Sequence, residues 1–476
     1  MTVRDFHALR SHLGLPPADE TDRFPAEVLA EAEQVASRGP QASVDRTEVP
    51  FVTIDPPGSM DLDQAVHLER TADGFVVHYA IADVGGAVQL GGAIDDEARR
   101  RGQTVYLPDG RVPLHPPVLS EGALSLLPDV VRAAVVWTVA VRADGEIGDV
   151  ALERALVRSV ARLDYEGVQQ SFDDGTPHAS IEALRDLGTV RREARLAAGA
   201  IDLALPSQHV VPAGDGWNVA LEPRTAADGW NAEVSLLTGM AAARLMVDGR
   251  VGLLRTLPGP PRGEIERFEE LAQRLGVEVP AGAGPGRVLA GLDLTEPRSL
   301  ALMTQATRLL RGAGYAAFDE EVPDVTTHAG IGGAYAQVTA PLRRLADRFS
   351  TQVCLALAAG ERPDQALRAA LDPVADAMAA SDRVAAEADR TAIDQVETWV
   401  MQDRTTDVFD AVVLRAATDQ RPAEVMVVDP PVVSEAHGDG LDAGAQVRVR
   451  VARVDAAERR VTYVTQACEH GECGNG

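Results

Sequence analysis

Three closely spaced aspartates carry the clearest chemical signal in the sequence. Asp55 ends the strand-like segment 51–54, and Asp61 and Asp63 follow a Pro-Pro-Gly turn that reverses the chain. Such a turn would bring three carboxylates toward one point, where their like charges would demand a cation. Hard cations such as Mg²⁺ take oxygen ligands and keep positions open for a substrate phosphate. The segment therefore predicts metal-assisted phosphodiester hydrolysis, with Mg²⁺, or Mn²⁺ in its place, as the metal.

Two other interpretations of this turn stay open when its residues are considered alone. Acidic turns are common as solvated, inert loops, and Asp61 and Asp63 partly match a calcium loop that lacks its glycine. The inert loop is the more common outcome for an isolated acidic turn. The turn therefore needs companions elsewhere in the chain before it indicates a site.

The charge of the chain limits how it could contact nucleic acid. The formal net charge is -27, whereas a protein that coats nucleic acid needs a concentrated basic surface. Any RNA contact must therefore be local. All 45 basic residues are arginines, which excludes Schiff bases, Ser-Lys dyads and lysine-bearing phosphate loops. No lysine-dependent cofactor is expected, and arginine suits bidentate contact with phosphate.

Length and composition favour a globular protein of two or three domains. The chain has 476 residues and 45% hydrophobic content. The longest apolar run, 133–141, is too short to span a membrane, and the N-terminus lacks a secretory pattern, so we expect a cytoplasmic monomer without membrane contact.

Three cysteines do not make a disulfide framework. Cys468, His470 and Cys473 could form a metal clip, but a solvated tail is favoured because structural zinc needs four ligands.

The periodicity of the chain divides it into four segments. Residues 1–45 form a small helical region, 46–403 an α+β body, 404–468 an all-β barrel of the OB type and 469–476 a flexible tail. Expected helices lie at 3–13, 26–37, 181–197, 232–248, 265–275, 298–311, 341–358 and 375–402, and expected strands at 51–54, 75–79, 135–141, 409–414, 423–428, 446–454 and 460–465. The stretches 258–263 and 280–286 are expected to be surface loops. The predicted fold class is α+β, a mixed sheet surrounded by helices, followed by a barrel of five short strands.

Further blocks follow the acidic turn in a specific order. They are Ala80-Ile-Ala-Asp-Val84, the run 94–108 that contains Tyr106, and the run 113–122. With the turn, these blocks resemble the RNB catalytic domain of the ribonuclease II family, and the resemblance extends from about 49 to 402. Three of the four family carboxylates match, and Gln64 stands where the fourth is found.

The resemblance implies how RNA would be held. Tyr106 corresponds to an aromatic on which a base stacks, and Tyr165 to one near the terminal nucleotide. Glu233, expected at the start of the helix 232–248, corresponds to a glutamate that contacts the terminal ribose. Leu203 stands where many relatives carry a phenylalanine that clamps the bases.

A last block carries the expected phosphate contacts. Residues 332–348 resemble the family motif Tyr-x-x-x-Thr-Ser-Pro-Ile-Arg, with Ala340 in place of the serine. We expect Pro341 to open a helix and Arg343, just inside it, to stabilise the transition state, with Arg344 as a further substrate contact. For an arbitrary Arg-Arg pair a solvated helix face would be the ordinary explanation.

The resemblance predicts a magnesium-dependent 3'-to-5' exoribonuclease that degrades single-stranded RNA to 5'-nucleoside monophosphates. Asp63 and Arg343 are the expected catalytic residues, and one or two metal ions would be held by Asp55, Asp61 and Asp63, with Gln64 as an uncertain ligand.

The barrel resembles the RNA-binding barrel that ends ribonuclease II chains. Fewer than about 50 residues precede the catalytic segment, so a short form without N-terminal cold-shock barrels is expected. A catalytically weakened RNA-binding or regulatory protein and a hydrolase of small phosphoesters are the alternatives.

Overall fold

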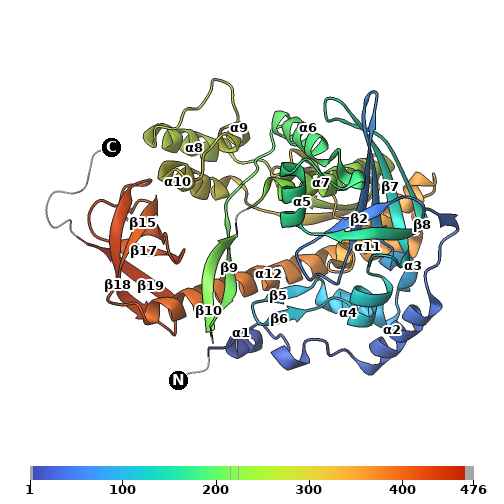
Figure 1. Ribbon diagram of the computed structural model, residues 1–476, viewed down its shortest axis with the longest axis horizontal. Helices are drawn as coiled ribbons and strands as arrows, with labels where there is room; N and C mark the ends of the chain where they lie inside the picture. Colours follow the sequence, from blue (N-terminus) through green and yellow to red (C-terminus); the bar gives the residue numbers. More distant parts are fainter. Residues whose placement is uncertain (1–3, 215, 223, 467–476) are drawn as a thin grey trace.

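The chain forms a large α+β body beside a small β-barrel (Figure 1). The computed structural model describes residues 4–214, 216–222 and 224–466, so Cys468, His470 and Cys473 lie outside the described residues. The α+β fold class predicted from the sequence is confirmed. Within the described ranges, none of the helices combines the length and the apolar character needed to cross a membrane.

A six-stranded mixed sheet forms the centre of the body. Its order is β1-β8-β2-β3-β4-β7, and β8 also pairs with β7, so the sheet curls back on itself. The strands are β1 (Val44–Asp45), β2 (Phe51–Ile54), β3 (Gln64–Thr71), β4 (Gly74–Ala82), β7 (Val131–Arg142) and β8 (Ile147–Leu163). β2 runs parallel to β8 and antiparallel to β3, and the Asp55 N–H donates to the Leu163 carbonyl at 3.1 Å. This pairing places the acidic turn at the end of β2.

The two faces of the sheet bury two separate cores. Along β4, Val77, Tyr79 and Ile81 enter one core while Ala80 and Ala82 enter the other, as the two-residue period of a strand requires. The first core is covered by α5 (Tyr165–Asp173), α6 (Leu184–Ala197), α7 (Ala226–Gly249) and α11 (Leu345–Ala358), and the second by α2 (Ala26–Arg38) and α4 (Ala93–Arg101). On β4, large side chains fill the first face and alanines the second.

The N-terminal region packs into the body and is not a free arm. Its helices are α1 (His7–His12), η1 (Ala18–Glu20) and α2, so the first is shorter than the expected helix 3–13. Phe6 lies 5.3 Å from the Trp217 ring and 5.5 Å from the Trp399 ring, measured between centroids. The segment therefore joins α12 (Gln365–Gln402) to the hairpin of β9 (Ser207–Ala213) and β10 (Gly216–Glu222) through aromatic contacts.

Several short elements were not predicted as strands or helices. The two-stranded pieces are β5 (Val105–Leu107) with β6 (Gly110–Val112), β9 (Ser207–Ala213) with β10 (Gly216–Glu222), β11 (Val251–Thr256) with β12 (Gly314–Asp319), and β13 (Thr327–His328) with β14 (Gly333–Ala334). The unpredicted helices are α3 (Val84–Ala87), η2 (Val118–Ala123), η3 (Ala179–Ile181) and α9 (Pro285–Ala290). The expected helix 265–275 corresponds to α8 (Arg262–Arg274), and the expected helix 298–311 to α10 (Pro297–Ala306) and η4 (Thr307–Leu309). The expected loop 280–286 is thus partly wrong, because Pro285 opens α9 at its first turn.

One long helix, α12 (Gln365–Gln402), connects the body to the barrel (Figure 1). It has 38 residues, which corresponds to roughly 57 Å of helix. The expected start at 375 is wrong, since the helix begins ten residues earlier, behind the Asp364 cap, and contains Pro373 in its interior. Met378 lies in the first core of the body, Val396 in the core around the β5–β6 hairpin, and Met401 in the barrel core.

The C-terminal domain is a closed five-stranded barrel, as predicted. Its order is β15 (Val408–Arg415), β16 (Ala423–Val427), β17 (Val433–His437), β19 (Arg460–Thr465) and β18 (Gln446–Asp455). Four of these strands match the expected segments, and β17 was missing from them. Phe409 and Tyr463 meet edge to face in its core at 6.5 Å between ring centroids. Closure removes the exposed strand edges that an open sheet of this size would present.

A buried glutamate joins α12, the β9–β10 hairpin and the barrel. The Glu397 Oε1 accepts hydrogen bonds from Gln208 Nε2 at 2.8 Å and from the Val433 N–H at 3.0 Å. Burial raises the pKa of this carboxyl to about 8, and the two hydrogen bonds offset only part of that shift. The junction therefore holds a protonated carboxyl at neutral pH.

The substitution Glu397→Gln should stabilise the protein at alkaline pH. The folded pKa of about 8 exceeds the ordinary value of 4.5, so the folded state holds a proton that the unfolded chain releases, and stability falls as pH rises between these values. Glutamine keeps the oxygen acceptor and removes the titration. The variant should melt roughly 2 °C above the parent at alkaline pH, with the difference shrinking toward pH 5, as measured by circular dichroism.

The matched control is Glu361→Gln, which removes an exposed carboxyl from the segment before α12. Its melting curve should follow that of the parent across the same pH range. A difference between parent and Glu397→Gln that does not change with pH would contradict the assigned shift.

Candidate active site

Asp55 lies at the end of β2 with one carboxylate oxygen unsatisfied. Its Oδ2 is buried and has no hydrogen-bond partner within the described residues. Burial raises the pKa of the carboxyl to about 6, Arg343 opposes this rise and the charge of Asp61 adds to it. An orphaned carboxylate oxygen in this position is a free ligand for a cation.

Asp63 is the most deeply buried member of the acidic turn. The side chain is 3% exposed, its Oδ1 accepts the Leu342 N–H at 2.7 Å, and its Oδ2 lies 3.5 Å from Arg343 Nε. Burial raises the pKa of this carboxyl to about 8, although Arg343 and the Leu342 N–H both favour the charged form. Without a bound cation the Asp63 carboxyl is therefore protonated at neutral pH, because its charged form has a high free energy in this position.

The loop between Asp55 and Asp63 is fixed by a serine outside it. Ser125 Oγ accepts the Leu62 N–H at 3.0 Å and donates to the Met60 carbonyl at 2.6 Å. Leu62 is fully buried in the second core, so Asp61 and Asp63 flank an apolar anchor. Asp61 remains partly exposed.

The donor atoms of this turn fit a hard cation, but they do not form a complete metal site as they stand. Across residues 4–214, 216–222 and 224–466, no three His, Cys, Asp or Glu side chains have an arrangement that could hold a metal. Asp55, Asp61 and Asp63 therefore do not converge as the set of metal ligands that the sequence predicted. They influence one another through their charges, since Asp61 raises the pKa of both other carboxyls. All available donors are oxygens, and the unsatisfied Asp55 Oδ2 and the buried Asp63 charge suit Mg²⁺.

Gln64 begins β3 and presents its carbonyl to two hydroxyl groups. Its Oε1 accepts from the Tyr79 hydroxyl and from Ser235 Oγ at 3.2 Å, and those two hydroxyls lie 2.9 Å apart. Burial raises the pKa of Tyr79, and the nearby charges of Asp55 and Asp63 raise it further, so the phenol stays protonated. The carbonyl that could have been a metal ligand is thus engaged by Tyr79 and Ser235.

Neither Tyr79 nor Ser235 was predicted as a site residue. Gln64 pairs with Ile81 and Val66 with Tyr79, so Gln64 and Tyr79 are diagonal neighbours on one face of the β3–β4 pair. The strand alternation alone would have identified Tyr79 once this register was known. Ser235 comes from α7, and no local pattern connects it with the turn.

Arg343 lies in a turn and not inside a helix, so the expected helix 341–358 was wrong at its start. α11 begins at Leu345, and Arg344 precedes it with extended backbone angles. The Arg343 carbonyl accepts the Thr104 N–H at 2.9 Å and the Leu345 N–H donates to the Gly102 carbonyl at 2.9 Å. These contacts with the segment before β5 replace the hydrogen bonds that a helix opened by Pro341 would have formed.

Arg344 and Asp347 hold the same turn from within. Arg344 donates from Nε to Asp347 Oδ2 at 3.0 Å and from Nη2 to Oδ1 at 2.7 Å, and Asp347 also accepts the Ala340 N–H at 2.6 Å. Asp347 is fully buried. The pair therefore positions the neighbouring Arg343, while a substrate contact of Arg344 stays a prediction.

Two tyrosines lie beside the carboxylates. Tyr106 on β5 is 51% exposed, and desolvation followed by the charge of Asp61 raises the pKa of its phenol to about 12. Tyr165 is the first residue of α5, and its pKa is raised by burial and then by Asp55. Both rings are therefore within electrostatic reach of the acidic turn, and the Tyr106 ring is free to meet a base.

Glu233 and Leu203 lie deeper than the sequence suggested. Glu233 is in the second turn of α7, because a Thr225–Asp228 capping box starts this helix at Ala226 and not at 232. The Glu233 carboxylate is 3% exposed and accepts from Arg195 Nε at 2.9 Å and Nη2 at 2.5 Å. Leu203 packs against the core of α8 and α10. Arg195, which holds Glu233, was not predicted from the sequence.

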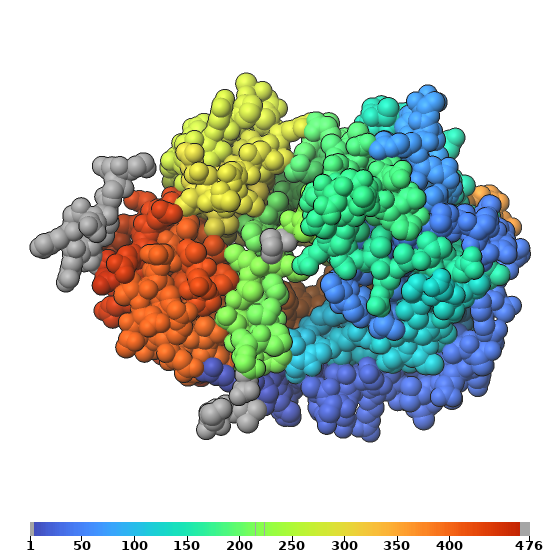
Figure 2. Space-filling model, in the orientation of Figure 1, coloured from blue at the N-terminus to red at the C-terminus, as the bar shows by residue number. Residues whose placement is uncertain are grey.

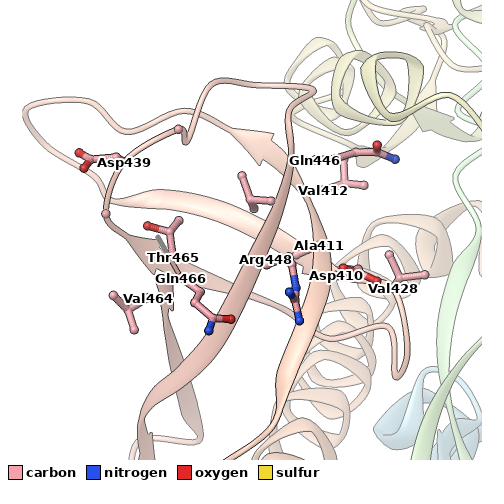
Figure 3. A pocket seen from close by; sticks show the side chains of 13 residues that line it. Asp410, Ala411, Val412, Val428, Asp439, Gln446, Arg448, Val464, Thr465 and Gln466 are labelled. Atoms are coloured by element: carbon pink, nitrogen blue, oxygen red, sulfur yellow. The ribbon is translucent and has the colours of Figure 1, made fainter. Parts of the chain in front are cut away.

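The described surface has a hollow next to the Tyr106 strand and a pocket on the barrel. Figure 2 shows the molecule hollowed between the green segment that contains the β9–β10 hairpin and the cyan segment that contains β5–β6. On the barrel, a pocket of about 900 Å³ lies along β15, β18 and the end of β19 (Figure 3). Arg448 and Gln466 lie on its wall with Asp410 and Val412, so the pocket combines polar and apolar contacts.

Comparison with known proteins places these features in a family. Residues 44–356 match the model of the RNB domain, and residues 407–464 match the RNase II-type exonuclease C-terminal S1 domain. The structure is similar to the apo form of Mycoplasma genitalium RNase R, with a TM-score of 0.82, 19% identity, and coverage of 93% of this chain and 76% of that chain. It is also similar to yeast Ssd1, described as a pseudonuclease, with a TM-score of 0.68, 16% identity, and coverage of 90% and 53%.

Curated relatives carry nuclease names. The chain is 28% identical to Ribonuclease R of Escherichia coli over 477 residues, which cover 90% of this chain and 58% of that protein. It is 31% identical to the probable exosome complex exonuclease RRP44 of Caenorhabditis elegans over 344 residues, or 67% and 34% of the two chains. The chain thus spans roughly half the length of the Ribonuclease R proteins it matches. With the RNB model covering more than half of it and the acidic turn in place, the chain belongs to the RNB family.

Proposed function

We propose that the chain is a divalent-metal-dependent exoribonuclease that degrades single-stranded RNA from the 3' end to 5'-nucleoside monophosphates. The observation that carries this proposal is the buried Asp63, held between the Leu342 N–H and Arg343 beside Asp55 and Asp61. Relatives named Ribonuclease R and exonuclease support the reaction class.

Asp55, Asp61 and Asp63 would hold one or two Mg²⁺ ions in this proposal. The metal supplies a water of lowered pKa and charge to offset that of the phosphodiester. Protein groups do the rest: Asp63 keeps its orientation through the Leu342 N–H, and the half-exposed Arg343 guanidinium faces the same space. A planar guanidinium there stabilises the negative charge that develops on the phosphoryl oxygens.

Stacking and ribose contacts would hold the RNA end. Tyr106 offers a half-exposed ring to a base, Tyr165 lies near the terminal nucleotide, and Glu233, oriented by Arg195, is the proposed ribose acceptor. Arg344 holds the turn through Asp347, and its contact with the substrate is part of the proposal. The S1 barrel would bind RNA through local contacts, as the net charge of -27 requires.

One observation favours a second candidate function. The Gln64 carbonyl is already engaged by Tyr79 and Ser235, so the fourth carboxylate of the family has no substitute ligand in this arrangement. A chain with a weakened metal site would retain RNA without releasing nucleotides. Such an RNA-binding or regulatory role is the alternative to exonuclease activity.

The substitution Asp63→Asn should abolish hydrolysis and leave RNA binding intact. Asparagine keeps an oxygen acceptor for the Leu342 N–H but removes the charge, so nucleotide release from a labelled single-stranded RNA in Mg²⁺ should fall at least about 100-fold. The exposed Asp73→Asn, in the β3–β4 turn, is the matched control. If the parent releases no mononucleotide while still retaining RNA, the nuclease assignment fails and the binding role stands.

The substitution Tyr106→Ala should weaken RNA binding by about tenfold or more, because stacking on an aromatic is worth about 1–3 kcal/mol per base. Tyr106→Phe keeps the ring and should bind like the parent. Fluorescence anisotropy with a labelled oligoribonucleotide in EDTA measures this without turnover. Equal dissociation constants for the alanine and phenylalanine variants would show that the ring does not stack.

The substitution Gln64→Glu should strengthen metal binding. Glutamate has the length of glutamine, keeps an oxygen for Tyr79 and Ser235, and adds a negative charge to the acidic turn. The Mg²⁺ concentration that gives half-maximal RNA hydrolysis should fall by about tenfold, or about 1.4 kcal/mol. Gln41→Glu, an exposed site, is the control. The same Mg²⁺ dependence in both variants would place residue 64 outside the metal site.

A further inference from the structure

A second cavity lies on the opposite side of the β5 strand from the exposed Tyr106 ring. It has a volume of about 580 Å³ and is enclosed by the segment after α1, the end of α4, the β5–β6 hairpin and α12. Cavities of about 300–1,000 Å³ are typical of sites for small ligands. Four arginines line this one: Arg23, Arg99, Arg100 and Arg101. So many cations at one cavity are unexpected in a chain of net charge -27.

One of these arginines is fully used by the fold. Arg101 donates to Glu97 at 2.7 Å, to the Pro113 carbonyl at 2.9 Å and to the Arg23 carbonyl at 3.0 Å. Its guanidinium also lies over the Phe24 ring. Arg101 therefore fixes the N-terminal segment against α4 and has no role left for a ligand.

The other three keep donors free. In the described part of the chain, Arg100 uses Nε and Nη2 on Glu97, Arg23 uses Nη1 on Glu20, and Arg99 uses Nε on Asp95. The Arg100 and Arg23 side chains are 67% and 74% exposed. At least one terminal nitrogen of Arg23 and of Arg100 is thus available, which suits contact with a phosphate. The Arg99 guanidinium instead lies over the buried Phe349 ring, 4.8 Å from its centroid.

The position of Arg99 and Arg100 at the end of α4 explains only part of the clustering of arginines at the cavity. Arginines in the last turn of a helix complement its dipole and pair with acidic residues one turn earlier, as Arg99 and Arg100 do here. That explanation does not account for Arg23, which comes from a different segment, or for the cavity that these residues share.

Apart from Gln103 and Ser381, the side chains on the rest of the cavity wall are apolar. Leu15, Val105 and Val384 come from three separate elements and line the space next to the arginines. A ligand that satisfies both parts carries a phosphate and a flat apolar body. We propose that this cavity binds a nucleoside phosphate, with the phosphate on Arg23 and Arg100 and the base against the apolar wall. This inference does not rest on the proposed nuclease activity.

The cavity and the candidate active site share one stretch of backbone. Gln103 lines the cavity while its main chain pairs with Arg344, and the next N–H, of Thr104, bonds the Arg343 carbonyl. Val105 is buried toward the cavity, and Tyr106 points away and is exposed. The nucleotide site is therefore distinct from the acidic turn, although it lies directly behind it.

Isothermal titration of the whole chain with AMP, ATP and inorganic phosphate, in EDTA and without RNA, tests the proposal. AMP and ATP should bind the parent with dissociation constants in the millimolar range or below, and more tightly than phosphate. The double variant Arg23→Gln/Arg100→Gln should weaken this binding by about tenfold. Ala380→Trp, at an exposed position on the α12 wall, should fill the cavity and abolish it.

The matched control is Arg262→Gln, which removes one arginine of an exposed pair with Glu266 on α8 and should bind like the parent. Equal binding of phosphate and AMP would overturn the proposal, as would no binding of either nucleotide at millimolar concentration. Binding that survives both cavity variants but is lost when single-stranded RNA is added belongs to the active site and also overturns it. Because the titration needs neither metal nor turnover, a failed nuclease assay leaves its outcome unaffected.

Discussion

Asp63 is buried beside other carboxylates, and a carboxylate in that position needs partners that hold it in place. The rest of the site depends on this requirement. Its partners are the Leu342 N–H and the Arg343 guanidinium. Both belong to one turn, and they follow Asp63 in the chain by 279 and 280 positions. That turn holds its shape only because Arg344 and Asp347 close it from inside and Gly102 and Thr104 bond it from outside. The acidic turn, the β5 hairpin and the start of α11 are therefore parts of one electrostatic unit.

Local periodicity predicted the long helices and four of the barrel strands, but β3 and the 17-residue β8 of the central sheet were not among the expected strands. β16 alternates between buried and partly exposed positions, a two-residue period that is visible without knowledge of its neighbours, whereas β2 is buried at every position. The start of α11 was not predictable in this way. Pro341 is an ordinary first residue for a helix, but the Leu345 N–H donates to the Gly102 carbonyl and the Arg343 carbonyl accepts from the Thr104 N–H. Long-range hydrogen bonds overrode the local preference there.

The residues of the candidate site likewise divide into those that the sequence identified and those that only the fold brings together. Asp55, Asp61 and Asp63 could be identified because they are close in sequence and follow a turn. Partners contributed by other elements could not: the Gln64 hydroxyl partners come from β4 and α7, and the Arg195 that holds Glu233 comes from α6. Residue identity also says nothing about burial, which is what raises the pKa of Asp63 and removes Glu233 from solvent. Which elements pair, and how deeply a side chain is buried, are decided by the fold and not by the local sequence.

The long helix α12 has a mechanical consequence. Because its side chains enter the body core at Met378 and the barrel core at Met401, neither lobe can slide along the other without pulling apart packed surfaces. Its one interior proline, Pro373, leaves a backbone carbonyl without its helical donor near the body end. The body nevertheless holds the helix well beyond that turn, because Ala392 and Val396 pack in the core around the β5–β6 hairpin. Only the residues from 397 to 402, about 9 Å of helix, extend past this core, so the barrel follows the body as a short, stiff extension.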